Sequence, residues 1–196
     1  MIMVELTPVP SAVLPVSDLA DHLRLASGFA DDGSQNARLE QCLRAAMAAI
    51  EARIGKALFQ RRFALTLTHG WKALSGHGLP VAPVASIDGV RLIDGRGAET
   101  VLDPSSYGLR RDTHRPQIIA TAAALPSPVQ GGSIEIEVTA GFSADWIGIP
   151  ADLREAMLSL ASEYYDQDQG GSSMIPSHIA ALIAPHRQMR LGGQVV

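Results

Sequence analysis

The sequence of 196 residues contains a single cysteine, Cys42, and only nine aromatic residues. One cysteine excludes an intramolecular disulfide, and the six histidines lack the spacing of known metal motifs. We therefore expect no metal site and no cofactor. A chain of this length buries about 70% of its unfolded surface, so its core needs neither. Cys42 stands beside Leu43 in an apolar pattern, which predicts a buried apolar cysteine rather than a nucleophile.

Long apolar runs are also missing. The longest uncharged stretch lies between Arg115 and Glu135, but prolines and glycines interrupt it. Its apolar part, residues 118–125, is much shorter than the roughly 20 residues that a membrane-spanning helix needs. The first 16 residues contain no lysine or arginine and several prolines, so we expect no secretory signal. These features predict a soluble protein that is made inside the cell.

Charge is distributed unevenly along the chain. Residues 1–55 and 117–168 carry net charges of −3 and −7, whereas residues 56–116 and 169–196 carry +4 and +2. The total of −4 is too mild for a surface dedicated to coating nucleic acid. Such banding suits stacking against other protein surfaces better than enclosing a small substrate.

Helical periodicity is strongest from Gln35 to about Ile54. Apolar residues recur there every three or four positions, at Leu39, Leu43, Ala46, Ile50 and Ile54. Gly55 follows at the place where a left-handed residue often ends a helix. This segment therefore predicts a long helix with one apolar face.

Three further helices are expected. Ser17 is a good N-cap for a helix at residues 18–25. Pro150 is suited to the first turn of a helix that continues to about residue 166. A short apolar helix is expected around residues 177–184, before Pro185.

The pattern between the helices has the period of β-strands. In the segment SIEIEVTA, apolar residues alternate with Glu135 and Glu137, which is typical of a half-buried strand. Asp94-Gly-Arg-Gly predicts a hairpin turn. We expect about six strands, within residues 59–68, 90–93, 100–102, 107–110, 117–120 and 133–140.

The order of these elements predicts an α+β fold in which a helical core is interrupted by a β-rich insertion. Within one overall domain we expect an N-terminal helical part at 1–58 and the insertion at 59–148. A C-terminal helical part at 149–184 and a flexible tail at 185–196 follow.

Motifs of catalysis are missing from the sequence. It has no HExxH, no GxSxG and no Walker loop, and the acidic loop at residues 31–34 does not match an EF-hand. These absences favour a structural protein over an enzyme. Paired arginines could touch phosphate or an acidic neighbour, or form a solvated surface; they are Arg61, Arg62, Arg110, Arg111 and Arg115.

One alternative from a different class stays open. A small-ligand-binding or enzymatic module could use a polar cluster in the β-rich part. Its residues would be Tyr107, Arg110, Asp112 and His114. Ordinary turns and strand edges explain the same cluster equally well.

Several segments occur in an order that matches a known family. They are DLADHLRL at 18–25, DDGSQNARLEQCLRAAMAAIEARIGKAL at 31–58, Trp71, LPVAPVASIDGV at 79–90, Tyr107-Gly-Leu, VTAGF at 138–142 and IPADLREAMLSLASEYYD at 149–166. Together they span most of the chain up to residue 166. In this order they resemble the head-tail connector (adaptor) proteins of long-tailed phages, including the adaptors of alphaproteobacterial gene transfer agents.

The resemblance implies a structural role without enzymatic activity. Copies would form a ring, usually a dodecamer, beneath the capsid portal protein, extend the channel for double-stranded DNA and receive a stopper or other tail-side protein. Assembly would occur in the bacterial cytoplasm, and the ring would end in the neck of a phage-like particle, without membrane contact. The alternative within this class is another neck ring, a stopper or tail terminator, which we expect to be richer in strands.

The resemblance also implies that the C-terminal segment reaches into the portal. The candidate portal-binding residues are His186, Arg187, Met189, Arg190 and Leu191. A flexible tail without acidic residues can order on binding, with basic groups and a few apolar anchors providing the attraction.

Overall fold

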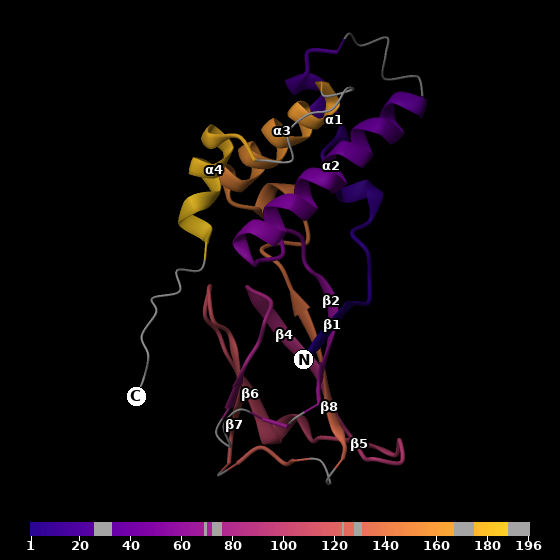
Figure 1. Cartoon of the computed structure of the whole chain (residues 1–196), viewed down its shortest axis with the longest axis vertical. Coiled ribbons are helices and arrows are strands. Elements are labelled where there is room, and N and C mark those ends of the chain that lie inside the picture. Colours follow the sequence, from indigo (N-terminus) through magenta and orange to yellow (C-terminus); the bar gives the residue numbers. More distant parts are fainter. Residues whose placement is uncertain are drawn as a thin grey trace. The chain divides into compact units, whose positions relative to one another are not determined.

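The computed structural model describes most of the chain, namely residues 1–25, 33–68, 70–71, 76–122, 124–127, 131–166 and 175–187. These residues form four α-helices and eight strands, and the strands make two antiparallel sheets (Figure 1). The expectation of a mixed fold of helices and strands is confirmed. The chain divides into two compact units: a β unit, residues 1–9 and 56–144, and a helical unit, residues 10–55 and 145–196.

The helical unit is built around helix α3 (Ala151–Asp166). Its other helices are α1 (Val16–His22), α2 (Gly33–Ile54) and α4 (Ser177–Ile183). Helix α3 packs against each of the other three. Within the described part of the chain, no helix is both long enough and apolar enough to cross a membrane.

The apolar stripe of α2 is buried as its spacing predicts. Leu39, Leu43, Ala46, Ile50 and Ile54 are all 2% exposed or less. Cys42 is a buried free cysteine, as expected. At the end of the helix, Gly55 has a φ of +69°, in the left-handed region that favours glycine, and its N–H donates to the carbonyl oxygen of Glu51 at 2.8 Å.

Helix α1 differs from its predicted range of 18–25. It begins at Val16, so Ser17 lies inside the helix and is not its N-cap. It ends early because Arg24 has a φ of +54°. The N–H groups of Leu25 and Arg24 then donate to the carbonyl oxygens of Ala20 and Asp21, each at 3.0 Å, which is the Schellman arrangement.

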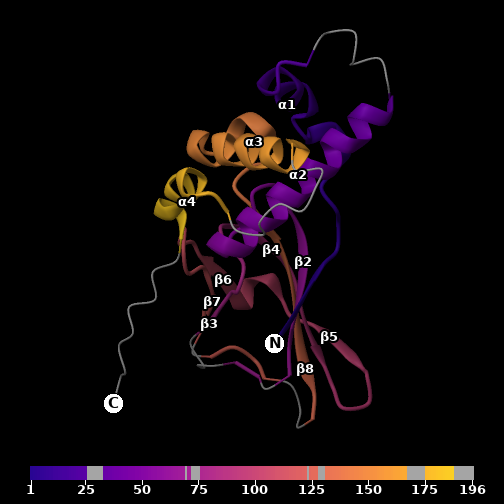
Figure 2. The same ribbon diagram turned by 45° about the horizontal axis from the view of Figure 1, so that its top comes forward.

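The β unit contains both sheets. The first has the strand order β1-β2-β8-β4-β5, with β1 (Ile2–Glu5), β2 (Arg61–Leu67), β8 (Ser133–Ala140), β4 (Val84–Ile93) and β5 (Glu99–Val101). The second has the order β3-β7-β6, with β3 (Gly76–Gly78), β7 (Gln117–Ala120) and β6 (Tyr107–Arg110). Figure 2 shows β5 in a hairpin that extends from the first sheet. The Asp94 turn of this hairpin is confirmed, since the N–H of Asp94 donates to the carbonyl oxygen of Ala98 at 3.0 Å.

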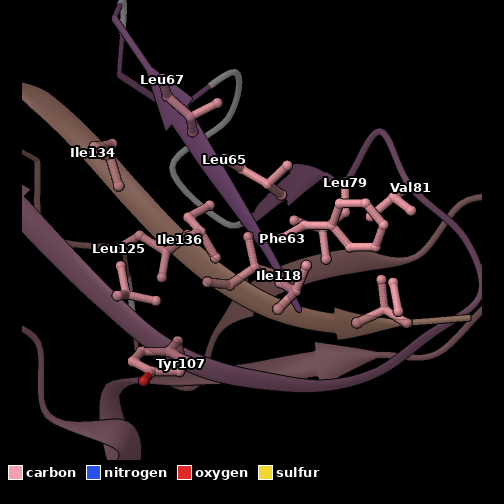
Figure 3. Close-up of a cluster of buried hydrophobic side chains, with 14 of the residues drawn as sticks. Phe63, Leu65, Leu67, Leu79, Val81, Tyr107, Ile118, Leu125, Ile134 and Ile136 are labelled. Atoms are coloured by element: carbon pink, nitrogen blue, oxygen red, sulfur yellow. The ribbon is translucent and has the colours of Figure 1, made fainter. Parts of the chain in front are cut away.

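Side chains from both sheets form the core of the β unit. In the first sheet Phe63 lies opposite Val138, and Leu65 lies opposite Ile136. These residues belong to the same buried cluster as Ile118 of the second sheet (Figure 3). The alternation predicted for residues 133–140 is confirmed, because Ile134, Ile136 and Val138 are fully buried.

Two strands beyond the expected six are present among the described residues, β1 and β3. Strand β1 is apolar at three successive positions, Ile2, Met3 and Val4, so it lacks the alternation that marks a half-buried strand. Strand β3 is Gly-His-Gly, which has low strand propensity, and it forms through pairing with β7. The domain boundaries expected at residues 58, 148 and 184 and the central position of the helices stay predictions.

Candidate interaction surfaces

Three of the motif segments meet at one place in the β unit, which we call the junction (residues 57–60, 82–83 and 141–143). The N–H of Ala57 donates to the carbonyl oxygen of Ala82 at 2.9 Å, and the N–H of Phe142 donates to that of Leu58 at 3.0 Å. Gly141 has a φ of +139°, and a Cβ there would lie 2.3 Å from the carbonyl oxygen of Phe59. The motif residues at the junction therefore join three backbone segments through hydrogen bonds and close backbone packing.

Lys56 directly precedes the junction and is 3% exposed. Within the described part of the chain, its Nζ has no hydrogen-bond partner. The Nζ lies 5.8 Å from the centre of the Phe142 ring. Burial lowers the pKa of Lys56, because it disfavours the charged form, and Asp112 opposes this shift. Holding a positively charged ammonium at this position therefore costs folding free energy.

The outer face of the first sheet carries a network of charges. Arg91 on β4 lies opposite Glu135 on β8 and pairs with it, and it also reaches Glu137 at 2.6 Å. Arg62 on β2 pairs with Glu137 and lies 3.9 Å from Asp88. Hydrogen bonding to Glu135, together with the neighbouring carboxylates, raises the pKa of Arg91. Basic and acidic side chains from adjacent strands thus neutralise one another on this face.

The paired arginines do not combine into one basic patch. Because successive strand residues face opposite sides, Arg61 points away from Arg62 and pairs with Glu5 at 2.9 Å. Arg110 donates to the side-chain oxygen of Gln117 at 3.2 Å, and Arg111 donates to the carbonyl oxygen of Ala85 at 3.1 Å. These contacts favour acidic and polar neighbours within the chain over phosphate.

The residues of the proposed ligand-binding cluster have separate local roles. Tyr107 is 8% exposed in the core, where burial, followed by the nearby charge of Asp103, raises its pKa. Asp112 accepts hydrogen bonds from the backbone N–H groups of His114 and Arg115, each at 2.7 Å, and these bonds lower its pKa. Among the described residues, no group of three or more His, Cys, Asp or Glu could hold a metal ion. Asp31 and Asp32 lie outside those residues.

Polar contacts in the helical unit join residues far apart in sequence. The indole N–H of Trp146 donates to Asp18 at 2.7 Å, and Arg38 donates to the carbonyl oxygen of Tyr165 at 2.9 Å while lying over its ring. Ser11 donates to Glu40 at 2.8 Å. This hydrogen bond and a second one from Arg44 lower the pKa of Glu40.

The base of the C-terminal tail is held by an acid–histidine contact. His186 Nε2 lies 2.6 Å from Asp152 Oδ2, in the first turn of α3. Arg187 is exposed beside it, whereas Met189, Arg190 and Leu191 lie outside the described residues. Of the candidate portal-binding residues, His186 thus has a partner within the chain. Sequence reasoning missed Asp152, because the two residues are 34 positions apart.

Comparison with known proteins gives a consistent result. No family model and no curated protein matches the chain. Among solved structures, a chain in the "Neck of empty GTA particle computed with C6 symmetry" is 45% identical with a TM-score of 0.88, and the match covers 98% of this chain and 99% of that one. A chain in the virion of the native gene transfer agent (GTA) particle is also 45% identical, with the same coverage and a TM-score of 0.87.

A third match is to the neck of the native GTA particle computed with C12 symmetry. It has 41% identity, a TM-score of 0.84 and the same coverage of both chains. The resemblance to the head-tail connectors of gene transfer agents is thereby confirmed. This chain belongs to the family of gene transfer agent neck proteins.

Proposed function

We propose that the chain is the head-tail adaptor of a phage-like particle, a structural protein without enzymatic activity. Copies form a ring, in our proposal a dodecamer, beneath the capsid portal, and the ring extends the DNA channel and joins the capsid to the tail-side protein. The observation that carries the proposal is the match to a neck protein over 98% of the chain at 45% identity.

Two further observations support a ring. The similar necks were computed with C6 and C12 symmetry, and both are symmetries of closed rings. The alternating charge of the sequence suits contacts between different surfaces of neighbouring copies, as a cyclic ring requires. DNA must slide through such a channel, and a mildly acidic chain is consistent with weak contact to its phosphates.

The helices favour an adaptor over another ring of the neck. A stopper or tail terminator is expected to be richer in strands, whereas here α2 has 22 residues and α3 has 16. The residues that suggested a ligand-binding site have other roles, because Tyr107 belongs to the core and Asp112 caps a turn. We retain the adaptor as the proposed function.

The simplest test of this role is removal of the chain during particle assembly. Cells that lack the gene are expected to produce DNA-filled capsids with portals but without attached tails, which electron microscopy of purified particles would reveal. Restoring the intact gene should restore tails. Tailed particles at normal frequency without this chain would refute the adaptor role.

The tail of the chain is proposed to bind the portal through Arg187, Met189, Arg190 and Leu191. In this proposal His186 acts differently: its contact with Asp152 fixes the point at which the tail leaves α4. Truncation after His186 should therefore leave the circular dichroism spectrum unchanged and abolish capture by the portal in a pull-down. The matched variant His186→Asn, with the tail intact, should weaken capture only moderately. Equal capture of truncated and intact chains would contradict portal docking by the tail.

A further inference from the structure

Strand β1 is an edge strand whose apolar side chains are exposed on both faces. Ile2 and Val4 are 59% and 52% exposed, and Met3 between them is 48% exposed. Leu6, immediately after the strand, is 43% exposed. In the register with β2, Ile2 and Val4 share the outer face with Thr66 and Ala64, whereas Met3 lies beside Leu65 on the core side. Both faces of this edge therefore offer apolar surface.

Strand β1 is held on one side by β2, and within the described part of the chain its other side is an open edge. The N–H of Leu6 donates to the carbonyl oxygen of Arg62 at 2.8 Å, and Glu5 pairs with Arg61 at 2.9 Å. Because the N–H of Leu6 faces β2 and antiparallel pairing alternates along a strand, the backbone groups of Met3 and Glu5 face away from β2. No strand among the described residues pairs with that side. Among the described residues, β1 is thus an ordered edge whose outward-facing backbone groups have no strand partner.

Soluble proteins usually protect such an edge with charge, proline or short length. The opposite edge of the same sheet is less apolar, because β5 is Glu-Thr-Val: Val101 is its only apolar residue, and Glu99, although it lies 3.8 Å from Arg91, is a largely exposed charge. Residues 1–4 contain no charged side chain, and the first charge, Glu5, is paired with Arg61. An unprotected apolar edge indicates a surface that is covered in the assembled state.

We propose that β1 binds a second copy of this chain, and that this contact joins neighbouring subunits of the ring. The inference rests on the proposed ring function. A second copy is the occupant because the similar necks have C6 and C12 symmetry, so in such a ring every subunit meets copies of itself. A cyclic ring has heterologous contacts, so β1 meets a different surface of the neighbour, not the neighbour's β1. Backbone pairing along β1 supplies the hydrogen bonds, and its exposed side chains supply apolar burial.

A proline substitution can test the backbone contact without harming the subunit. Met3→Pro removes an N–H that faces away from β2, so the pairing of β1 with β2 is retained. The purified variant should keep the wild-type circular dichroism spectrum and melting temperature. In particles assembled with it, occupancy of the neck ring should fall about tenfold or more. Met3→Ala, which keeps the N–H, should form rings at close to the wild-type level.

The same proposal is tested without any variant by electron cryomicroscopy of the wild-type neck. The expected map shows the free edge of β1 within hydrogen-bond distance of the adjacent copy. A ring in which β1 faces solvent or a different protein would overturn this inference and leave the adaptor role intact. Full ring occupancy with folded Met3→Pro would overturn it too. Absence of any ring of the wild-type chain would instead overturn the proposed function.

Discussion

The β unit and the helical unit place their polar contacts differently. In the β unit, charges face one another across adjacent strands, as Arg91 and Glu135 do on the outer face of a sheet. In the helical unit, polar contacts join different helices and the short turns beside them, such as Trp146 to Asp18 of α1 and His186 to Asp152 of α3. Strand alternation places Arg62, Arg91, Glu135 and Glu137 on the face opposite the core, whereas each contact between helices depends on how those helices pack. Substitutions in the two units should therefore have different consequences.

The largest effect is expected from a charge placed in the helical core. Ile50 is fully buried in α2, so Ile50→Asp should lower the free energy of unfolding by about 4 kcal/mol or more. Urea titration followed by circular dichroism would measure the loss. Ala52→Asp, at an exposed position two residues later, is the matched control and should change stability by less than about 1 kcal/mol. A soluble Ile50→Asp protein of normal stability would mean that the buried face of α2 is misassigned.

A cavity in the β unit should cost somewhat less. Ile136 is fully buried on β8 between Leu65 and Val90 of the flanking strands. Ile136→Ala should lower the free energy of unfolding by about 3 kcal/mol. Thr66→Ala, on the outer face of β2, should cost less than about 1 kcal/mol. Equal losses from the two variants in thermal denaturation would contradict the assignment of core and outer faces.

Removing the buried charge near the junction should have the opposite sign. Lys56→Met should stabilise the protein by about 1–2 kcal/mol at pH 7, because a desolvated ammonium is replaced by an apolar side chain of similar length. The pKa of Lys56 is lower in the folded protein than in the unfolded chain. Between those two pKa values the unfolded state binds more protons, so wild-type stability should gain from rising pH in that window. The advantage of Lys56→Met should shrink accordingly, and a loss of stability at pH 7 would show that the ammonium is well accommodated.

The smallest effect is expected on the charged face of the β unit. Arg91→Met should cost only about 0.5–1 kcal/mol, since the Arg91 side chain is 35% exposed and solvent screens its pairs with Glu135 and Glu137. The difference from wild type should diminish when sodium chloride is raised to about 1 M. A cost that does not change with salt would assign packing, rather than charge, as the main contribution of Arg91.

Sequence patterns predicted the elements that obey a single periodicity. The stripe of α2, the alternation in β8 and the left-handed Gly55 depend on local spacing, and all three are present as predicted. The early end of α1 was not predictable, because the left-handed residue there is Arg24, which has no glycine-like preference. Strand β3 was missed because its pairing with β7, not its composition, makes it a strand.

The candidate interaction residues were predicted less well than the fold. Consecutive arginines suggested a patch, but strand geometry sends Arg61 and Arg62 to opposite faces. The contact of His186 with Asp152 depends on the packing of α4 against α3, and no local pattern reports it. The exposure of β1 could not be predicted for a related reason: an apolar run does not indicate which of its residues will be buried.

The proposed role as the adaptor between portal and tail can be tested by mixing the purified chain with its cognate portal protein and imaging the product by electron cryomicroscopy. We expect a ring of copies stacked coaxially on the portal, with the C-terminal tail of each copy in contact with it. Free subunits beside bare portals, or a ring that binds only the tail-side protein, would contradict the adaptor role.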